Sequence, residues 1–109
     1  MKVAIAVDGE HVSQHFGRCE RYEVVELNGE EMVGRQALPN PGQEPGRLPR
    51  MLNELGVDTV IAGGIGRRAQ DMFLLFGIVT LTGVSGPVGQ ALERLAAGEL
   101  KDGESTCEH

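Results

Sequence analysis

The sequence contains no tryptophan, and its 109 residues include one tyrosine and three phenylalanines. Aromatic stacking on bases, which many single-stranded nucleic-acid sites use, is therefore poorly supplied. Basic residues are also in deficit, because ten lysines and arginines face sixteen acidic residues and give a formal net charge of -6. An acidic protein repels phosphate backbones at long range, so we expect no nucleic-acid partner.

Long hydrophobic runs are missing as well, and cysteines are few. The apolar run near the amino terminus, Val3 to Val7, is too short for a signal sequence or a membrane span. We therefore expect a cytoplasmic protein with no membrane partner. The cysteines are Cys19 and Cys107. In the cytoplasm, two cysteines are more often free thiols or metal ligands than a disulfide.

Several short segments have the pattern of β-strands. Residues 2–7 form a continuous apolar run that predicts a central strand buried on both faces. Residues 22–38 predict a hairpin, because Asn28-Gly29 suits a tight turn with positive φ. Two further buried strands, each preceded by a short joint, are expected at 57–64 and 78–83.

The second half of the sequence repeats a helical pattern. Apolar residues recur at the spacing i, i+3, i+4, i+7, which predicts one buried stripe on each of three amphipathic helices. A glycine that can adopt the left-handed conformation follows each stripe and ends the helix. The stripes cover 48–55, 69–76 and 88–95, and the glycines are Gly56, Gly77 and Gly98.

The resulting order, β-β-β-α-β-α-β-α, predicts an α/β fold. We expect a three-layer α/β/α domain over residues 1–99 with a five-stranded mixed sheet, as in the ribonuclease H-like architecture. The first strand is central, with the hairpin on one side and two parallel strands on the other. Residues 100–109 are polar and lack periodicity, and we interpret them as a flexible tail.

This topology predicts where a ligand site lies. Ligands of open α/β sheets bind outside the carboxyl ends of the parallel strands. The segments at those ends are Asp8 to Cys19, Ala62 to Arg68 and Thr82 to Pro87. We expect them to converge on one edge of the domain. Ser85 or Gly86 is expected to cap the last helix, whose amino terminus would face the same crevice.

The first of these segments contains His11, His15 and Cys19 at a spacing of four residues. Imidazole and thiolate groups bind zinc and the iron of iron–sulfur clusters. The alternative is that Phe16 anchors the loop in the core, Gly17 permits the turn, and the histidines are solvated. We favour solvation for His11. Two cysteines and two histidines would complete a tetrahedral zinc set, and the candidate ligands are His15, Cys19, Cys107 and His109.

The second segment, AGGIGRRA, is a candidate anion site. Gly63, Gly64 and Gly66 allow close backbone approach just before a helix begins near Arg67. Cations at a helix amino terminus oppose the helix dipole, so Arg67 and Arg68 favour an anionic ligand between them. The alternative is that the glycines permit tight packing and the arginines point into solvent.

Catalytic constellations are not found in the sequence. Asp8 is placed as a nuclease carboxylate would be, but the later parallel strands end at Ala62-Gly63 and Thr82-Gly83, which supply no second one. A Ser/His/Asp set and a cysteine with a defined base are also missing. We therefore expect a protein that is not an enzyme.

Two motifs stand out in the sequence. They are S-x-H-F-G-R at 13–18 and G-V-D-x-V-I-A-G-G-I-G-x-R-A at 56–69, and an NP pair stands between them at 40–41. In combination they resemble the dinitrogenase iron–molybdenum cofactor biosynthesis family. The resemblance implies a ribonuclease H-like fold and a carrier that binds an iron–molybdenum cofactor or iron–sulfur precursor without catalysis. It also implies donor and acceptor proteins as partners, and His15 as a cofactor contact.

The hypotheses differ in cargo and site. The favoured one is a cluster carrier whose contacts are His15, Cys19, Gly63, Gly64, Gly66 and Arg68. The resemblance also implies a tail that contains cysteine and histidine, here Cys107 and His109. Many relatives have a His-Gly pair before the first helix, and this sequence does not. The alternative is a small regulatory or interaction module with a zinc site, or with a phosphate or nucleotide site. A homodimer would bring two Cys19 loops together, but the sequence does not require one.

Overall fold

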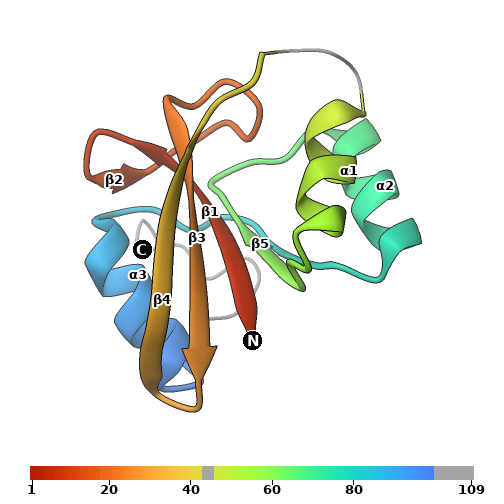
Figure 1. Ribbon diagram of the computed structural model, residues 1–109. Coiled ribbons are helices and arrows are strands. Elements are labelled where there is room, and N and C mark those ends of the chain that lie inside the picture. The colour runs from red at the N-terminus through yellow and green to blue at the C-terminus, as the bar shows by residue number, and fades with distance from the viewer. Residues whose placement is uncertain (43–45, 100–109) are drawn as a thin grey trace.

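The structure is a computed structural model that describes residues 1–42 and 46–99. Strands and helices alternate in the second half of the chain as predicted (Figure 1). Within the described ranges, no helix is both long and apolar enough to cross a bilayer. The elements in chain order are β1 (Lys2–Asp8), β2 (His11–Val12), β3 (Arg21–Asn28), β4 (Glu31–Pro39), α1 (Arg47–Glu54), β5 (Thr59–Ile61), α2 (Arg67–Phe76), β6 (Val79–Leu81) and α3 (Val88–Ala96).

The main sheet is mixed and has the order β4-β3-β1-β5-β6. β1 pairs antiparallel with β3 and parallel with β5, and β5 pairs parallel with β6. The predicted sheet, with the first strand in its centre, is therefore confirmed. β2, which pairs with the end of β1, was not predicted from the sequence. A strand of two residues is too short to show an alternation in the sequence.

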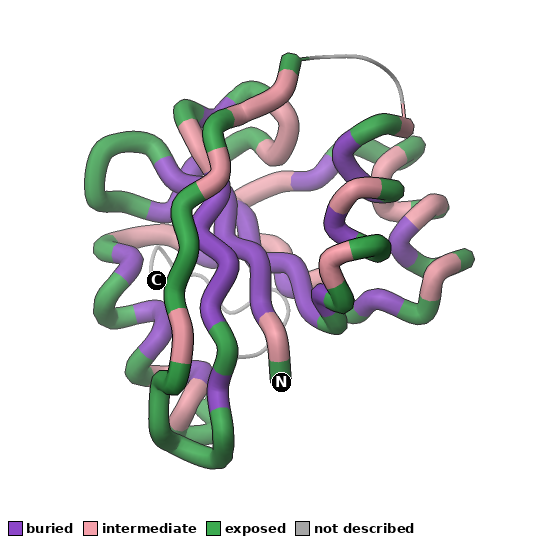
Figure 2. The backbone as a smooth tube through the Cα atoms, viewed as in Figure 1, coloured by how far each residue is buried: buried purple, intermediate pink, exposed green. Residues whose placement is uncertain are grey.

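Helices cover both faces of the sheet because β1 alternates between two cores. Its residues Val3, Ile5 and Val7 pack in one apolar cluster with α3. Ala4 and Ala6 pack in the other cluster with α1 and α2. Figure 1 shows α3 on one side of the sheet and the other two helices on the opposite side. The buried backbone runs through the central strands, whereas the edge strand β4 is mostly exposed (Figure 2).

The predicted helix ends are confirmed. Gly56, Gly77 and Gly98 have φ angles of 81°, 76° and 76°, which are left-handed. The hairpin turn, in contrast, was placed one residue too early. Asn28 is the last residue of β3 and pairs with Glu31, so the loop consists of Gly29 and Glu30. A bulge between Glu26 and Leu27 shifts the register of the two strands, and periodicity alone does not reveal such a shift.

Candidate functional site

The segments predicted to converge at the ends of the parallel strands do so through backbone hydrogen bonds. The Gly63 amide donates to the Ser13 carbonyl at 2.8 Å, and the Gly83 amide donates to the Gly63 carbonyl at 2.8 Å. The Val12 amide donates to the Gly86 carbonyl at 2.9 Å. The three segments therefore form one continuous edge of the domain.

The loop that follows β2 is held in one conformation by its own backbone. The amide of Ser13 donates to the Ala6 carbonyl at 2.7 Å, and the amide of Phe16 donates to the Gly64 carbonyl at 2.9 Å. The amide of His15 donates to the Ser13 hydroxyl at 3.2 Å. An i to i+3 bond of 3.2 Å, from the Arg18 amide to the His15 carbonyl, closes the turn. The candidate metal ligand His15 thus belongs to a fixed turn rather than to a helix.

The side chain of Phe16 anchors this turn in the core. Its ring lies 5.2 Å from the ring of Tyr22 and 5.3 Å from the ring of Phe73, between centroids. These tilted and edge-on arrangements are the favourable ones for aromatic pairs. Gly17 follows with a φ of 96°, which a residue with a side chain rarely adopts. The structural roles suggested for Phe16 and Gly17 are therefore confirmed.

The two candidate ligands of the turn have different environments. His15 is exposed, whereas the Cys19 side chain is buried in the apolar cluster beneath α1 and α2. Burial and the neighbouring Cys19 thiol raise the pKa of the Tyr22 hydroxyl well above its ordinary value. Tyr22 therefore stays protonated and accepts a hydrogen bond of 2.9 Å from the Gly17 amide. Cys19 thus packs beside the group that supports the turn, and His15 is the side chain that a ligand can reach.

Gly63 and Gly64 are explained by the close approach of this turn. A Cβ atom at Gly63 would lie 2.8 Å from the Cα atom of Gln14, and one at Gly64 would lie 3.1 Å from the Gln14 carbonyl oxygen. The Gly63 amide already donates to Ser13. The tight packing that the sequence analysis left open is therefore present, and it joins the diglycine to the turn rather than to a helix.

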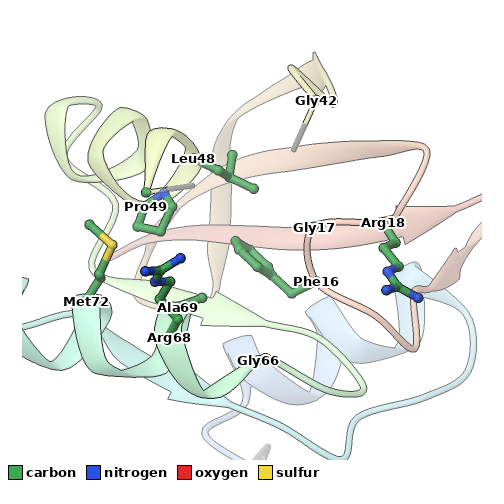
Figure 3. A pocket seen from close by; sticks show the side chains of 11 residues that line it. Phe16, Gly17, Arg18, Gly42, Leu48, Pro49, Gly66, Arg68, Ala69 and Met72 are labelled. Atoms are coloured by element: carbon green, nitrogen blue, oxygen red, sulfur yellow. The ribbon is translucent and has the colours of Figure 1, made fainter. Parts of the chain in front are cut away.

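A cavity of about 260 Å³ lies between this turn and the starts of α1 and α2. We call it the Phe16 groove. Apolar side chains make up much of its wall, and Figure 3 shows the Arg68 side chain near Pro49 and Met72 while Arg18 extends away. Arg67 instead lies 3.5 Å from Asp71 in an exposed ion pair. The lining residues are Phe16, Gly17, Arg18, Gly42, Gly46, Leu48, Pro49, Gly66, Arg68, Ala69 and Met72.

Two helix amino termini border the Phe16 groove. The N-caps of α1 and α2 are Gly46 and Gly66, which have no side chain to bind the first amides of the helix. The first turns read RLPR and RRAQ, so they contain no carboxylate. Amides at helix starts attract anions. This wall of the groove therefore favours a negatively charged ligand.

The second helix amino terminus at the groove belongs to α1, whereas we expected that of the last helix, α3. The start of α3 lies on the opposite face of the sheet, and the amide of Val88 donates to the Glu10 carbonyl at 2.9 Å. Its N-cap is Pro87, so the expectation that Ser85 or Gly86 caps this helix was wrong. The role of α1 as a wall of the groove was not predicted, because the sequence pattern does not reveal which face of the sheet this helix covers.

The described ranges contain no group of three or more histidine, cysteine, aspartate and glutamate side chains arranged to bind a metal ion. The proposed zinc ligands Cys107 and His109 lie outside these ranges. His11, which we expected to be solvated, is exposed on β2. Its backbone forms an isolated antiparallel β-bridge with Pro87. Among the candidate contacts, Gly66 and Arg68 line the Phe16 groove. Gly63 and Gly64 bind the backbone of the turn that contains His15, but these three residues are not part of the groove lining.

A mixed α/β sheet with helices on both faces places this domain in the class of open α/β sheets, in which ligands bind beyond the carboxyl ends of the parallel strands. Residues 1–98 match the family described as dinitrogenase iron-molybdenum cofactor, and the chain belongs to that family.

The chain is also similar to individual proteins. The protein PH0822, whose crystal structure is known, is 33% identical in sequence to this chain. The two structures align over 100% of both chains with a TM-score of 0.87. The uncharacterized protein MJ0580 of Methanocaldococcus jannaschii is 25% identical over 93% of this chain and 90% of its own. The apo form of the orange protein from Desulfovibrio gigas is similar in fold, with 18% identity, a TM-score of 0.77, and coverage of 95% of this chain and 93% of that chain.

Proposed function

We propose that this protein is a non-catalytic carrier for an iron–sulfur or iron–molybdenum-type cluster, or for a precursor of one. In this proposal the cluster is cargo that donor and acceptor proteins of cofactor assembly exchange through the Phe16 groove. Membership of the family supports the cargo class. The observation that carries the proposal is the fixed turn that presents an exposed His15 directly before Phe16, which lines the groove.

The electrostatics of the groove support an anionic cargo. Clusters rich in sulfide and thiolate are negatively charged, and the starts of α1 and α2 together with Arg68 provide positive potential on one wall. Imidazole nitrogen is a ligand for iron. A fixed turn lowers the entropy cost of ligation, because the backbone is already ordered before the cluster arrives.

The donor set supports transfer rather than permanent storage. His15 is exposed, whereas Cys19 as a residue is 4% exposed within the core. Ligation by Cys19 stays a prediction and requires the turn to open. A cluster held mainly by one imidazole, helix amides and a guanidinium keeps open coordination positions, which an acceptor protein can fill. Because the reaction is exchange of cargo, the proposed role requires no catalytic group.

The same groove supports a second candidate function. The amino termini of α1 and α2 would also attract phosphate, either free or as part of a nucleotide. In this second function the chain is a small regulatory module that senses an anion. Thermal unfolding with inorganic phosphate and with nucleotides separates it from the carrier, because neither ligand contains iron. The zinc alternative depends on Cys107 and His109, which lie outside the described residues.

Anaerobic reconstitution with iron and sulfide tests the carrier. We expect the protein to bind iron with charge-transfer absorbance, and His15→Ala to reduce the bound iron by about tenfold because the exposed imidazole is lost. His11→Ala is the matched control, since His11 is exposed on β2 at the start of the same segment. Arg68→Ala should also reduce binding, whereas Arg67→Ala should not, because Arg67 pairs with Asp71. A wild-type protein that takes up no iron, or equal losses in both histidine variants, would refute the proposal.

A further inference from the structure

Asn40, in the loop after β4, contacts the turn that contains His15. Its side-chain amide nitrogen donates to the Gly17 carbonyl at 3.1 Å and to the Cys19 carbonyl at 2.8 Å. Its side-chain oxygen accepts a hydrogen bond of 3.0 Å from the Gly42 amide. Asn40 is the first residue of the NP pair at 40–41. One side chain therefore binds three backbone groups in two separate loops.

These hydrogen bonds complete the support of Gly17. The amide of Gly17 donates to the Tyr22 hydroxyl at 2.9 Å, and its carbonyl accepts from Asn40. The left-handed φ of 96° at this residue is thus held from both sides. Neither polar group of Gly17 depends on solvent, so the turn can keep its conformation beside an open groove.

Asn40 also joins two neighbouring parts of the Phe16 groove lining. Gly17 and Gly42 both line the groove, and each forms a hydrogen bond with the Asn40 side chain. Figure 3 shows Gly17 beside Phe16 and Gly42 in the separate loop above it. Because a single planar amide binds both loops, it holds these two segments of the lining against each other.

We propose that Asn40 is a positioning residue, which holds the Gly42 loop against the turn that contains His15 and fixes the conformation of that turn. The inference rests on the proposed carrier function for its link to cargo. Asparagine meets the chemical requirement because it supplies two N–H donors and one acceptor. Aspartate has the same shape but cannot donate when ionised, and it would place its charge beside two carbonyl oxygens.

Asn40→Asp and Asn40→Ala test this inference in the full chain. Amide hydrogen exchange of Gly17, Arg18 and Cys19 is measured first, because it needs no cargo. We expect the exchange of these amides to accelerate by roughly tenfold or more. The reason is that both variants lose the hydrogen bonds from the Asn40 side chain to the Gly17 and Cys19 carbonyls, which hold the turn closed. Asn28→Asp is the matched control, because it introduces the same charge at the exposed hairpin end of β3, away from the groove.

Iron retention under a chelator then separates positioning from general stability. Both Asn40 variants should release iron several-fold faster than the wild type. Ile78→Val, a change in the buried core outside the groove lining, controls for lost stability and should release iron at the wild-type rate. Unchanged exchange in a folded Asn40→Asp would overturn the inference, as would faster iron release in Ile78→Val equal to that of the Asn40 variants. If the wild type binds no iron, the carrier function fails, and the exchange result alone decides whether Asn40 positions the turn.

Discussion

At the scale of single residues, the contact between Gly63 and Gln14 sets the position of the turn. The two backbones approach so closely that a Cβ atom at Gly63 would lie 2.8 Å from the Cα atom of Gln14. This separation is shorter than real Cβ atoms show, and the neighbouring atom is backbone that cannot rotate away. The absence of one methyl group therefore permits the turn to dock against the end of β5.

Replacing Gly63 by alanine should damage both stability and cargo binding. We expect Gly63→Ala to lower the free energy of unfolding by about 1–3 kcal/mol, because the added methyl group overpacks a fixed backbone contact. Urea denaturation measures this loss.

Gly89→Ala is the matched control for the Gly63 variant. Gly89 lies in α3, and a Cβ atom there meets nothing within 4 Å. This substitution should leave stability unchanged or raise it by up to about 1 kcal/mol, because alanine favours the helix. Equal destabilisation by both variants would contradict the contact argument.

At the scale of one element, β3 is joined to its neighbour β4 by a half-buried ionic network. The Glu23 carboxylate accepts a hydrogen bond of 2.8 Å from Arg21 and another of 2.8 Å from Arg35. The Glu23 side chain is 8% exposed. Burial alone would raise the pKa of Glu23, but the hydrogen bonds from Arg35 and Arg21 outweigh it and hold the pKa below its ordinary value.

The network should make stability fall in acid. A carboxylate with a lowered native pKa contributes fully above its unfolded pKa, near 4.5, and loses that contribution as the pH falls through the native value. We expect the free energy of unfolding to decline from about pH 5 downward.

Glu23→Gln tests this prediction by urea denaturation at a series of pH values. It should cost about 1–2 kcal/mol at pH 7, because the charged hydrogen bonds are weakened at partly exposed arginines. It should also flatten the decline in acid. Glu26→Gln is the control, since Glu26 is exposed on the same strand. A decline that is as steep in Glu23→Gln as in Glu26→Gln would contradict the assignment.

At the scale of the whole molecule, β1 joins two hydrophobic cores. Alternate residues of this strand pack against α3 on one face and against α1 and α2 on the other. Neither core can lose β1 without exposing apolar surface of the other. We therefore expect the domain to unfold as one cooperative unit.

The single tyrosine makes this cooperativity measurable. Tyr22 is fully buried in the core beneath α1 and α2, and tryptophan is missing from the sequence. In Leu92→Ala the lesion lies in the opposite core and should cost about 2–5 kcal/mol. Tyrosine fluorescence and far-ultraviolet circular dichroism should still give the same denaturation midpoint in this variant. Separate midpoints would show that the two cores unfold independently.

The larger strands, the helices and their order in the main sheet could be predicted from the sequence, whereas β2 and the register of the hairpin could not. The strands, the helices and the glycines that end them follow from periodicity and backbone freedom, which are local properties. Convergence of the three loops follows from the topology, because parallel strands end at one edge. The ribonuclease H-like assignment stays a prediction, as do the ligand roles of Cys19, Cys107 and His109.

Tertiary structure decided which groups face one another at that edge. It placed Cys19 in the core and left His15 exposed. The sequence alone does not distinguish the two as metal ligands. It also put the start of α1, rather than α3, at the groove and used Asn40 to join two loops. These outcomes depend on contacts between segments far apart in the chain. A local pattern describes the residues within one segment, and it contains no information on which distant backbone that segment will meet.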